Sequence, residues 1–180
     1  KNFDRYYNAN SISKEINISP RGALKAFRNL EAKGIAKGEE IGKSIIFKPL
    51  LNEYALKFIE LTLIEEAQQY RLWTEEFKEI FGLADMMILF GSIIDKKQEA
   101  RDIDVLIVAD KENRKKIQSL INERQKILPK KIHLILLTKE DVSRNIKEHN
   151  KSFLGILKTG KVLSGASFFV KLIKNVSSKK

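Results

Sequence analysis

Two motifs between residues 89 and 108 contain the residue types that phosphate chemistry needs. The first is the pair Gly91-Ser92, which directly follows an apolar segment ending at Phe90. The second is the acidic pair Asp102 and Asp104, at the start of another apolar segment. Side chains two residues apart on a β-strand lie on the same face. We therefore expect the two carboxylates to emerge side by side.

These residues suit metal-assisted phosphoryl or nucleotidyl transfer. Two like charges held close together need a counter-ion, and Mg²⁺ prefers carboxylate oxygens together with substrate phosphates. Gly91 would let the backbone approach a phosphate closely, and the Ser92 hydroxyl could donate to its oxygens. Lys96 and Arg101 would add positive charge near the phosphates. The predicted cofactor is Mg²⁺, with an NTP as substrate or ligand.

Buried strands that alternate with helices are predicted to position these motifs. The apolar segments predict three strands, at residues 86–90, 102–108 and 131–137. The pattern between and after them predicts helices over residues 112–127, 140–155 and 168–176. The expected fold class is α/β (α+β), a small mixed sheet with flanking helices.

The two motifs, taken with their flanking strands, resemble a known signature. Gly91-Ser92 followed by Asp102-Ile103-Asp104 is similar to the Gly-Ser, Asp-x-Asp signature of the DNA polymerase β-like nucleotidyltransferase superfamily. More closely, residues 86–138 resemble the archaeal-type minimal nucleotidyltransferases of prokaryotes, which are often antitoxin-type partners of small helical proteins. The resemblance implies transfer of a nucleotidyl group from Mg-NTP to a protein or RNA acceptor. The alternative is an acidic strand end on another α/β domain.

The resemblance also implies a third carboxylate on the later strand, and the matching position holds His133. Histidine is neutral or cationic near pH 7 and is a poor Mg²⁺ ligand. Three alternatives stay open: a weaker one-metal enzyme, an enzyme with His133 as general base, or a nucleotide-binding fold without catalysis. His133 can equally be a non-catalytic strand residue. The candidate catalytic residues are Asp102, Asp104 and His133, of which the two aspartates are the metal ligands.

The first third of the chain has the pattern of two helices followed by a hairpin. Ser11 predicts the start of a first helix, and Ser19-Pro20 the start of a second over residues 20–33. Short strands are predicted at residues 35–37 and 43–48, with the turn region between them. Residues 3–48 resemble the winged helix-turn-helix of prokaryotic transcription regulators, whose preceding helix would lie upstream of Lys1.

Basic residues on the second predicted helix suggest a DNA-binding face. Their spacings of four and three residues place them in one solvent-facing stripe, and a further lysine lies on the predicted wing. The candidate DNA-binding residues are Arg21, Lys25, Arg28 and Lys43. Glu39 and Glu40 argue against close phosphate approach by the wing. The alternative is a winged helix used for protein contacts or for a homodimer.

These patterns predict three parts. Residues 1–50 would form the winged helix-turn-helix, residues 51–82 a helical linker with a break near Gln68, and residues 83–180 the nucleotidyltransferase-like domain. The predicted partners are duplex DNA, an NTP and a protein or RNA acceptor.

Composition restricts the class of protein. The 34 Lys and Arg residues against 23 Asp and Glu residues give a formal charge of +11, which favours a polyanionic partner. The lack of cysteine excludes disulfides and thiolate zinc sites and fits the cytoplasm. The longest apolar runs are far shorter than a membrane span. We therefore expect a cytoplasmic protein without a membrane partner.

Two main hypotheses for function follow, and a third class of function is a pure interaction module. In the first, the protein is a Mg²⁺-dependent nucleotidyltransferase that also carries a DNA-binding domain. In the second, it is a DNA-binding transcription regulator or antitoxin-like protein of a toxin-antitoxin operon, and its nucleotidyltransferase domain is catalytically degenerate. His133 favours the second hypothesis, whereas the intact Asp102 and Asp104 pair favours retained metal and nucleotide binding.

Overall fold

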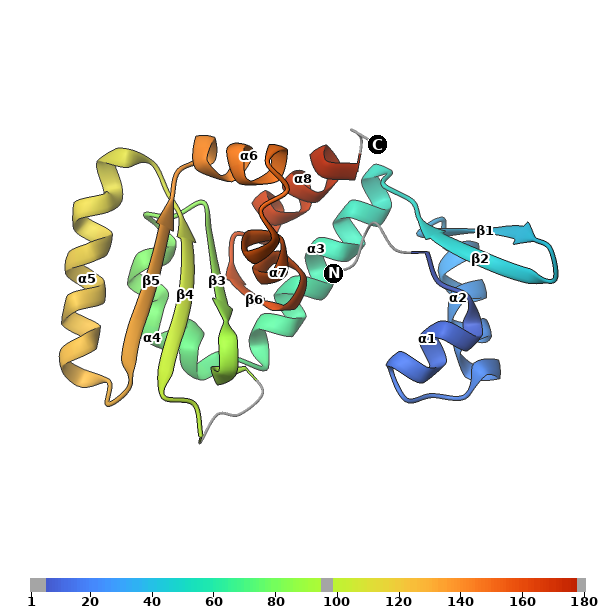
Figure 1. The fold of residues 1–180 in the computed structure, drawn as a ribbon, viewed down its shortest axis with the longest axis horizontal. Helices are drawn as coiled ribbons and strands as arrows, with labels where there is room; N and C mark the ends of the chain where they lie inside the picture. Colours follow the sequence, from blue (N-terminus) through green and yellow to red (C-terminus); the bar gives the residue numbers. More distant parts are fainter. Residues whose placement is uncertain (1–5, 95–98, 178–180) are drawn as a thin grey trace. The chain divides into compact units, whose positions relative to one another are not determined.

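The predicted apolar strands form the centre of a four-stranded sheet (Figure 1). The computed structural model describes residues 6–94 and 99–177. The sheet has the order β5-β4-β3-β6, with β4 parallel to β5 and β3 antiparallel to both of its neighbours. The strands are β3 (Met86–Phe90), β4 (Asp102–Val108), β5 (Lys131–Leu137) and β6 (Lys161–Ser164). The three predicted strands are confirmed, and β6 adds a fourth.

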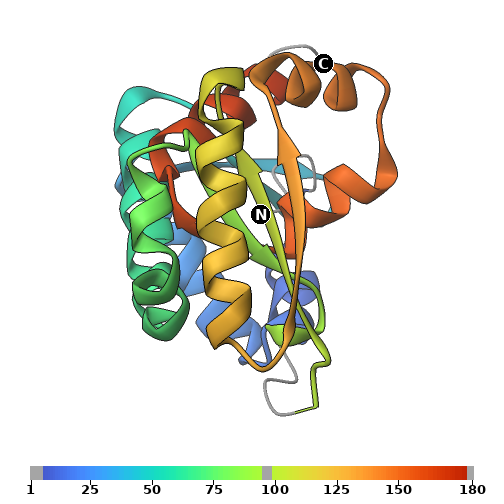
Figure 2. The same cartoon turned by 90° about the vertical axis from the view of Figure 1, so that its left-hand side faces the viewer.

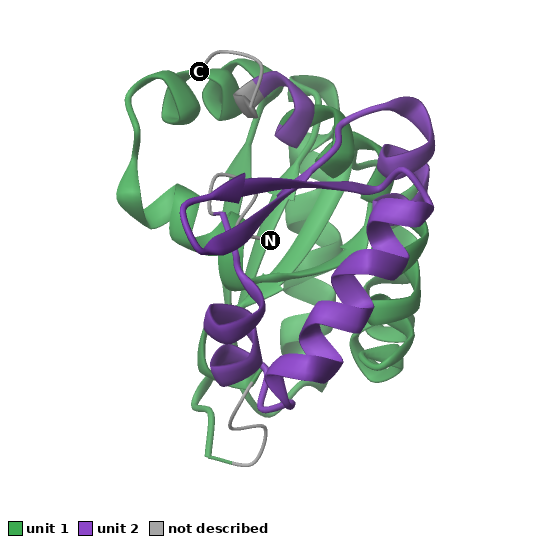
Figure 3. Cartoon of the chain, turned by 90° about the vertical axis from the view of Figure 1, so that its right-hand side faces the viewer, with its two compact units in different colours: residues 1, 61–172 green, residues 2–60, 173–180 purple. Residues whose placement is uncertain are grey.

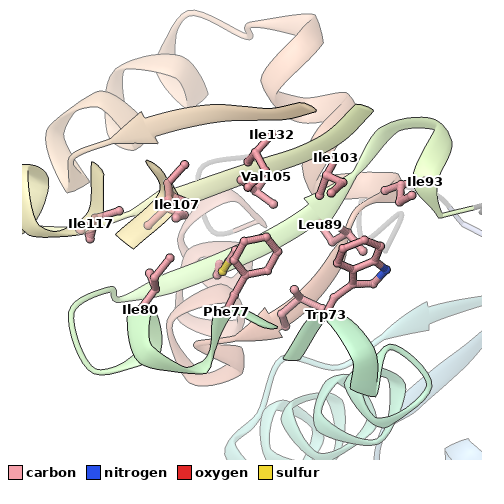
Figure 4. Close-up of a cluster of buried hydrophobic side chains, with 14 of the residues drawn as sticks. Trp73, Phe77, Ile80, Leu89, Ile93, Ile103, Val105, Ile107, Ile117 and Ile132 are labelled. Carbon is pink, nitrogen blue, oxygen red and sulfur yellow. The ribbon is translucent and has the colours of Figure 1, made fainter. Parts of the chain in front are cut away.

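One face of this sheet packs against two helices, α4 (Arg71–Phe81) and α5 (Arg114–Ile127). Alternate strand positions point towards these helices, and Leu89, Val105 and Ile107 are fully buried there. Burial of each such side chain stabilises the fold by roughly 1.5–3 kcal/mol. The cluster, shown in Figure 4, includes Trp73, Phe77, Ile80, Leu89, Ile103, Val105, Ile107 and Ile117. The α4 helix therefore contributes directly to the core of the sheet.

The opposite face of the sheet is covered from the C-terminal part of the chain. Gly160 follows α7 (Lys151–Thr159), and a Cβ atom added to it would lie 2.4 Å from Ile88 Cγ2. Because Ile88 alternates with Leu89 along β3, α7 covers the face that α4 and α5 leave open. Figure 2 shows α5 in front of the sheet, with α6 (Lys139–Lys147) beyond the end of β5. The chain ends in α8 (Ala166–Ser177).

Two long predicted helical stretches are interrupted. The expected break near Gln68 is confirmed, because α3 (Glu53–Gln68) ends there and α4 starts at Arg71. The single helix predicted over residues 140–155 is wrong. Its place is taken by α6 and α7, between which His149 has a φ of +52°, a left-handed conformation that ends a helix. The Asn150 side chain then caps α7 by accepting the Phe153 N–H at 3.1 Å.

The N-terminal helices begin at residues that cap them. The first helix, α1 (Ala9–Glu15), starts earlier than predicted because Asn8 caps it. Asn8 Oδ1 accepts the Ser11 N–H at 2.8 Å, and Ser11 Oγ accepts the Asn8 N–H at 3.1 Å. The second helix, α2 (Pro20–Ala32), starts as predicted, with the Ser19 hydroxyl accepting the Gly22 N–H at 3.1 Å.

The hairpin after α2 is longer than predicted. Strands β1 (Ala36–Ile41) and β2 (Ser44–Pro49) pair along their whole length and are joined by Gly42 and Lys43. Gly42 has a φ of +61°, which a two-residue hairpin turn requires and which glycine adopts without strain. The predicted turn over residues 38–42 was therefore too wide. Phe47 on β2 is 2% exposed and stacks on Phe27 of α2, with ring centroids 4.4 Å apart.

The chain divides into two compact units, drawn in different colours in Figure 3. Residues 61–172, with residue 1, form the larger unit, and residues 2–60 with 173–180 form the smaller one. Within the described residues, none of the helices is both long enough and apolar enough to span a bilayer. The mixed α+β fold with two sheets agrees with the predicted fold class.

Candidate functional site

The turn that follows β3 lies directly against an acidic side chain of β4. This turn is a short 3-10 segment, η1 (Gly91–Ile93), and Gly91 has a φ of +75°. A Cβ atom at Gly91 would lie 2.1 Å from Asp104 Oδ2, which is closer than non-bonded atoms can approach. Only glycine therefore allows this backbone conformation and this contact together.

Asp102 and Asp104 lie on one face of β4. Ile103 between them is 1% exposed in the cluster beside α4 and α5, so the two carboxylates point to the opposite face. Their side chains are 38% and 24% exposed. The predicted side-by-side arrangement is thus present, at a partly exposed position on this face of the sheet.

His133 faces the same two carboxylates from the neighbouring strand. Parallel pairing of β4 with β5 sets Asp104 opposite His133. The imidazole Nδ1 lies 3.3 Å from Asp104 Oδ1, and Nε2 lies 3.9 Å from Asp102 Oδ1. The side chain is 46% exposed. The imidazole therefore occupies the place beside the acids where the resemblance implies a third carboxylate.

The predicted phosphate-binding residues are arranged around the same end of β4. Ser92 is exposed on η1, directly after Gly91. Arg101 is exposed and directly precedes Asp102. Lys96 lies outside the described residues. Ser92 and Arg101 thus share with Gly91 the end of the sheet where the carboxylates emerge.

The carboxylate pair is the part of this site that suits a metal ion. Within the described residues, no group of three or more His, Asp or Glu side chains is arranged to hold a metal. Two partly exposed carboxylates on one strand nevertheless provide the oxygen donors that Mg²⁺ takes when substrate phosphates and water complete its coordination. The residues present therefore fit a cation held jointly by protein and nucleotide.

Sequence reasoning overlooked one charged residue at this site, Lys131. The register of β4 and β5 sets Lys131 opposite Asp102, and it is exposed. Its position two residues before His133 is visible in the sequence, but its closeness to Asp102 depends on how the strands pair.

A separate apolar hollow of about 280 Å³ lies on the far face of the sheet, against Trp73 and Ile103. Neither carboxylate lines it.

The candidate DNA-binding residues of the smaller unit differ in their surroundings. Arg21 and Lys25 are exposed on α2, and Lys43 is exposed at the hairpin turn. Arg28 instead lies 2.6 Å from Glu31 Oε2. The Arg28 guanidinium and then the Gly38 N–H, which donates to Glu31 at 2.8 Å, hold the pKa of the Glu31 carboxyl below its usual range.

Two further charges of the hairpin pair with each other. Lys48 Nζ lies 2.6 Å from Glu39 Oε2 and 5.0 Å from the centroid of the Tyr6 ring. This contact lowers the pKa of Glu39 and raises the pKa of Lys48. The predicted repulsion between Glu39 and phosphate is therefore partly neutralised within the hairpin.

Replacing Gly91 by alanine is expected to displace the Asp104 carboxylate. The positive φ alone should cost about 1–3 kcal/mol of stability, and the added Cβ collides with Asp104 as well. We expect the variant to lose Mg²⁺-dependent NTP binding. Thermal unfolding and an NTP titration measure the two effects.

Gly34→Ala is the matched control for this experiment. Gly34 has a φ of +68°, but an added Cβ would meet no atom within 4 Å. This variant should be destabilised by backbone strain and still bind Mg-NTP. Parental Mg-NTP binding by the Gly91→Ala variant would show that the contact between Gly91 and Asp104 is not part of the site.

One of three comparisons with known proteins gave a match. Neither the curated proteins nor the solved structures gave a match to the chain. A family model described as a nucleotidyltransferase domain matches residues 71–155, a range that includes α4, η1, β4 and β5. This match supports nucleotidyl transfer as the general activity and an NTP as ligand. It supports a relation of residues 71–155 to the nucleotidyltransferase superfamily.

Proposed function

We propose that the larger unit binds Mg-NTP and transfers a nucleotidyl group to a hydroxyl of a protein or an RNA. The observation that carries this proposal is the pair Asp102 and Asp104 on one face of β4, with the Gly91 backbone against Asp104. The family match supports the same reaction class.

The proposed reaction exchanges one phosphorus–oxygen bond for another. The acceptor oxygen bonds to the α-phosphorus, the bond from that phosphorus to pyrophosphate breaks, and the acceptor hydroxyl loses its proton. Asp102 and Asp104 would hold Mg²⁺, which when bound supplies positive charge to the phosphates and the leaving pyrophosphate. Ser92 would donate to phosphate oxygens, and His133 is the candidate acceptor for the proton.

A binding titration followed by a labelling assay tests this proposal. A fluorescent ATP analogue is titrated with the full chain in Mg²⁺ and in EDTA. The chain is then incubated with labelled NTP and cell extract. We expect Mg²⁺ to tighten binding at least tenfold and to be required for any labelled acceptor. Equal binding with and without Mg²⁺ would contradict a metal-dependent site.

We further propose that residues 1–50 form a winged helix-turn-helix that binds duplex DNA. The supporting observation is the order α1, α2 and hairpin, with Arg21 and Lys25 exposed on α2 and Lys43 at the turn. The formal charge of +11 also favours a polyanionic partner.

Alanine at Arg21, Lys25 and Arg28 is expected to weaken duplex DNA binding. Each lost phosphate contact should flatten the salt dependence of the binding constant by about one unit of slope. Arg21 and Lys25 should contribute more than Arg28, because Arg28 already pairs with Glu31. Fluorescence anisotropy of labelled duplex DNA over a range of salt concentrations measures both effects.

The control for this experiment replaces three exposed lysines of α5, namely Lys115, Lys116 and Lys126, by alanine. It removes the same charge from the larger unit. Equal DNA affinity of the α2 variant and the parent at every salt concentration would show that the recognition face is wrongly assigned.

The alternative function is a transcription regulator or antitoxin-like protein whose nucleotidyltransferase domain lacks catalysis. The observation that favours it is the imidazole of His133 beside Asp104, where a third acid would complete a metal site. The labelling assay separates the two functions, because this alternative predicts NTP binding without a labelled product. A homodimer and a cytoplasmic location stay predictions.

A further inference from the structure

The edge strand of the sheet sets two basic side chains opposite the two acids. Parallel pairing places Lys131 opposite Asp102 and His133 opposite Asp104. Paired residues on neighbouring strands lie on the same face, about 4.8 Å apart along the hydrogen-bonding direction. Two acids on β4 and two basic residues on β5 therefore form one patch at the proposed NTP site.

Lys131 is free to contact a ligand, whereas two other lysines at the ends of β5 have structural roles. Lys130 donates to the Ala100 carbonyl, and Lys139 contacts Asp85 and Asp110 at 3.0 and 3.3 Å. No described residue forms an ion pair or a side-chain hydrogen bond with Lys131, which is exposed. Its ammonium group is thus available to a ligand, on a residue that pairs with Asp102 across the strands.

The charges at the site favour such a cation. Two carboxylates and one divalent ion sum to zero, so they would offer no net positive charge to a triphosphate that carries several negative charges. Among the described residues, exposed Lys131 pairs with Asp102 across the strands, and exposed Arg101 directly precedes Asp102 along the chain. Lysine, a compact charge on a flexible stem, is a suitable partner for phosphate oxygens.

We propose that Lys131 binds the triphosphate tail of the NTP and supplies positive charge that a single metal ion, balanced by two carboxylates, does not provide. The inference rests on the proposed NTP site and names a residue that determines its preference for triphosphates. During transfer, the same contact would stabilise the charge that accumulates on the leaving pyrophosphate.

The test compares Lys131→Ala, Lys131→Arg and Lys131→Gln with the parent. A fluorescent ATP analogue bound in Mg²⁺ is displaced by tripolyphosphate or by AMP. We expect the alanine and glutamine variants to bind tripolyphosphate about tenfold more weakly, with a change of less than threefold for AMP. Arginine should restore most of the affinity because it keeps the charge. Unfolding temperatures should stay close to the parent value, because the Lys131 side chain is exposed and forms no ion pair or hydrogen bond with a described residue.

Lys116→Ala is the control, because it removes one exposed lysine at the start of α5, beyond the opposite end of β4. Equal tripolyphosphate displacement in the Lys131→Ala and Lys116→Ala variants would overturn the inference. Lys131 would then be a charged residue that keeps the edge strand β5 from pairing with a strand of another chain. A parent that binds no Mg-NTP would instead overturn the proposed function. The two failures are therefore distinguishable.

Discussion

Asparagine at both Asp102 and Asp104 is expected to abolish the Mg²⁺ dependence of NTP binding and to leave the fold intact. The amide has nearly the same shape as the carboxylate but carries no charge, so it cannot balance a divalent cation. Both side chains are partly exposed, at 38% and 24%, so neither is a core residue. The ratio of dissociation constants in EDTA and in Mg²⁺, at least ten for the parent, should fall to about one.

Thermal unfolding without Mg²⁺ gives an independent measurement on the same variant. Removing two adjacent like charges should leave the unfolding temperature unchanged or higher. A matched control, Asp110→Asn with Glu112→Gln, removes two exposed charges beyond the other end of β4 and should keep Mg²⁺-dependent binding. If the Asp102 and Asp104 variant kept parental Mg²⁺ dependence, the metal site would have to lie elsewhere in the chain.

The strands and the acidic pair were predictable because their signals are local. Residues 86–90 are entirely apolar, residues 103–109 are apolar except for Asp104, and both segments are too short for helices, which indicates buried strands. The period of two along β4 was enough to place Asp102 and Asp104 on one face. The Ser19-Pro20 start of α2 was predictable for the same reason, since a cap needs only its immediate neighbours.

Other features depend on contacts that local pattern does not show. The break at His149 was missed because the helical pattern of residues 140–155 continues through it, while the backbone leaves the helix there. The hairpin of β1 and β2 was predicted too short because its length follows from the pairing of Ile41 with Ser44. Lys131 was overlooked because its closeness to Asp102 requires the register of β5 against β4.

Aspartate at position 133 is expected to increase Mg²⁺-dependent nucleotidyl transfer by about a hundredfold. His133 Nδ1 already lies 3.3 Å from Asp104 Oδ1, so a carboxylate at this position would join the acidic pair. One well-placed metal ligand can stabilise the transition state by several kcal/mol, and about 2.7 kcal/mol corresponds to a hundredfold in rate. The labelling assay with NTP and extract measures this gain against a parent that we expect to transfer weakly.

Two controls distinguish the effect of the added carboxylate on transfer from the effect of losing the imidazole. His133→Asn removes the imidazole without adding charge, and His149→Asp adds a carboxylate at the other, exposed histidine, where aspartate tolerates a left-handed backbone. Neither should increase transfer. Without Mg²⁺, three adjacent carboxylates repel one another, so His133→Asp should unfold at a lower temperature and regain more stability from Mg²⁺ than the parent does.

The pattern across these variants decides among the three roles left open for His133. A gain only in His133→Asp indicates a site that lacks one metal ligand. Robust labelling by the parent that falls in both His133→Asp and His133→Asn identifies the imidazole as the working base and contradicts the expected gain. If all variants bind Mg-NTP and none labels an acceptor, the missing carboxylate is not what prevents transfer. The domain then acts through nucleotide binding, as the regulator hypothesis requires.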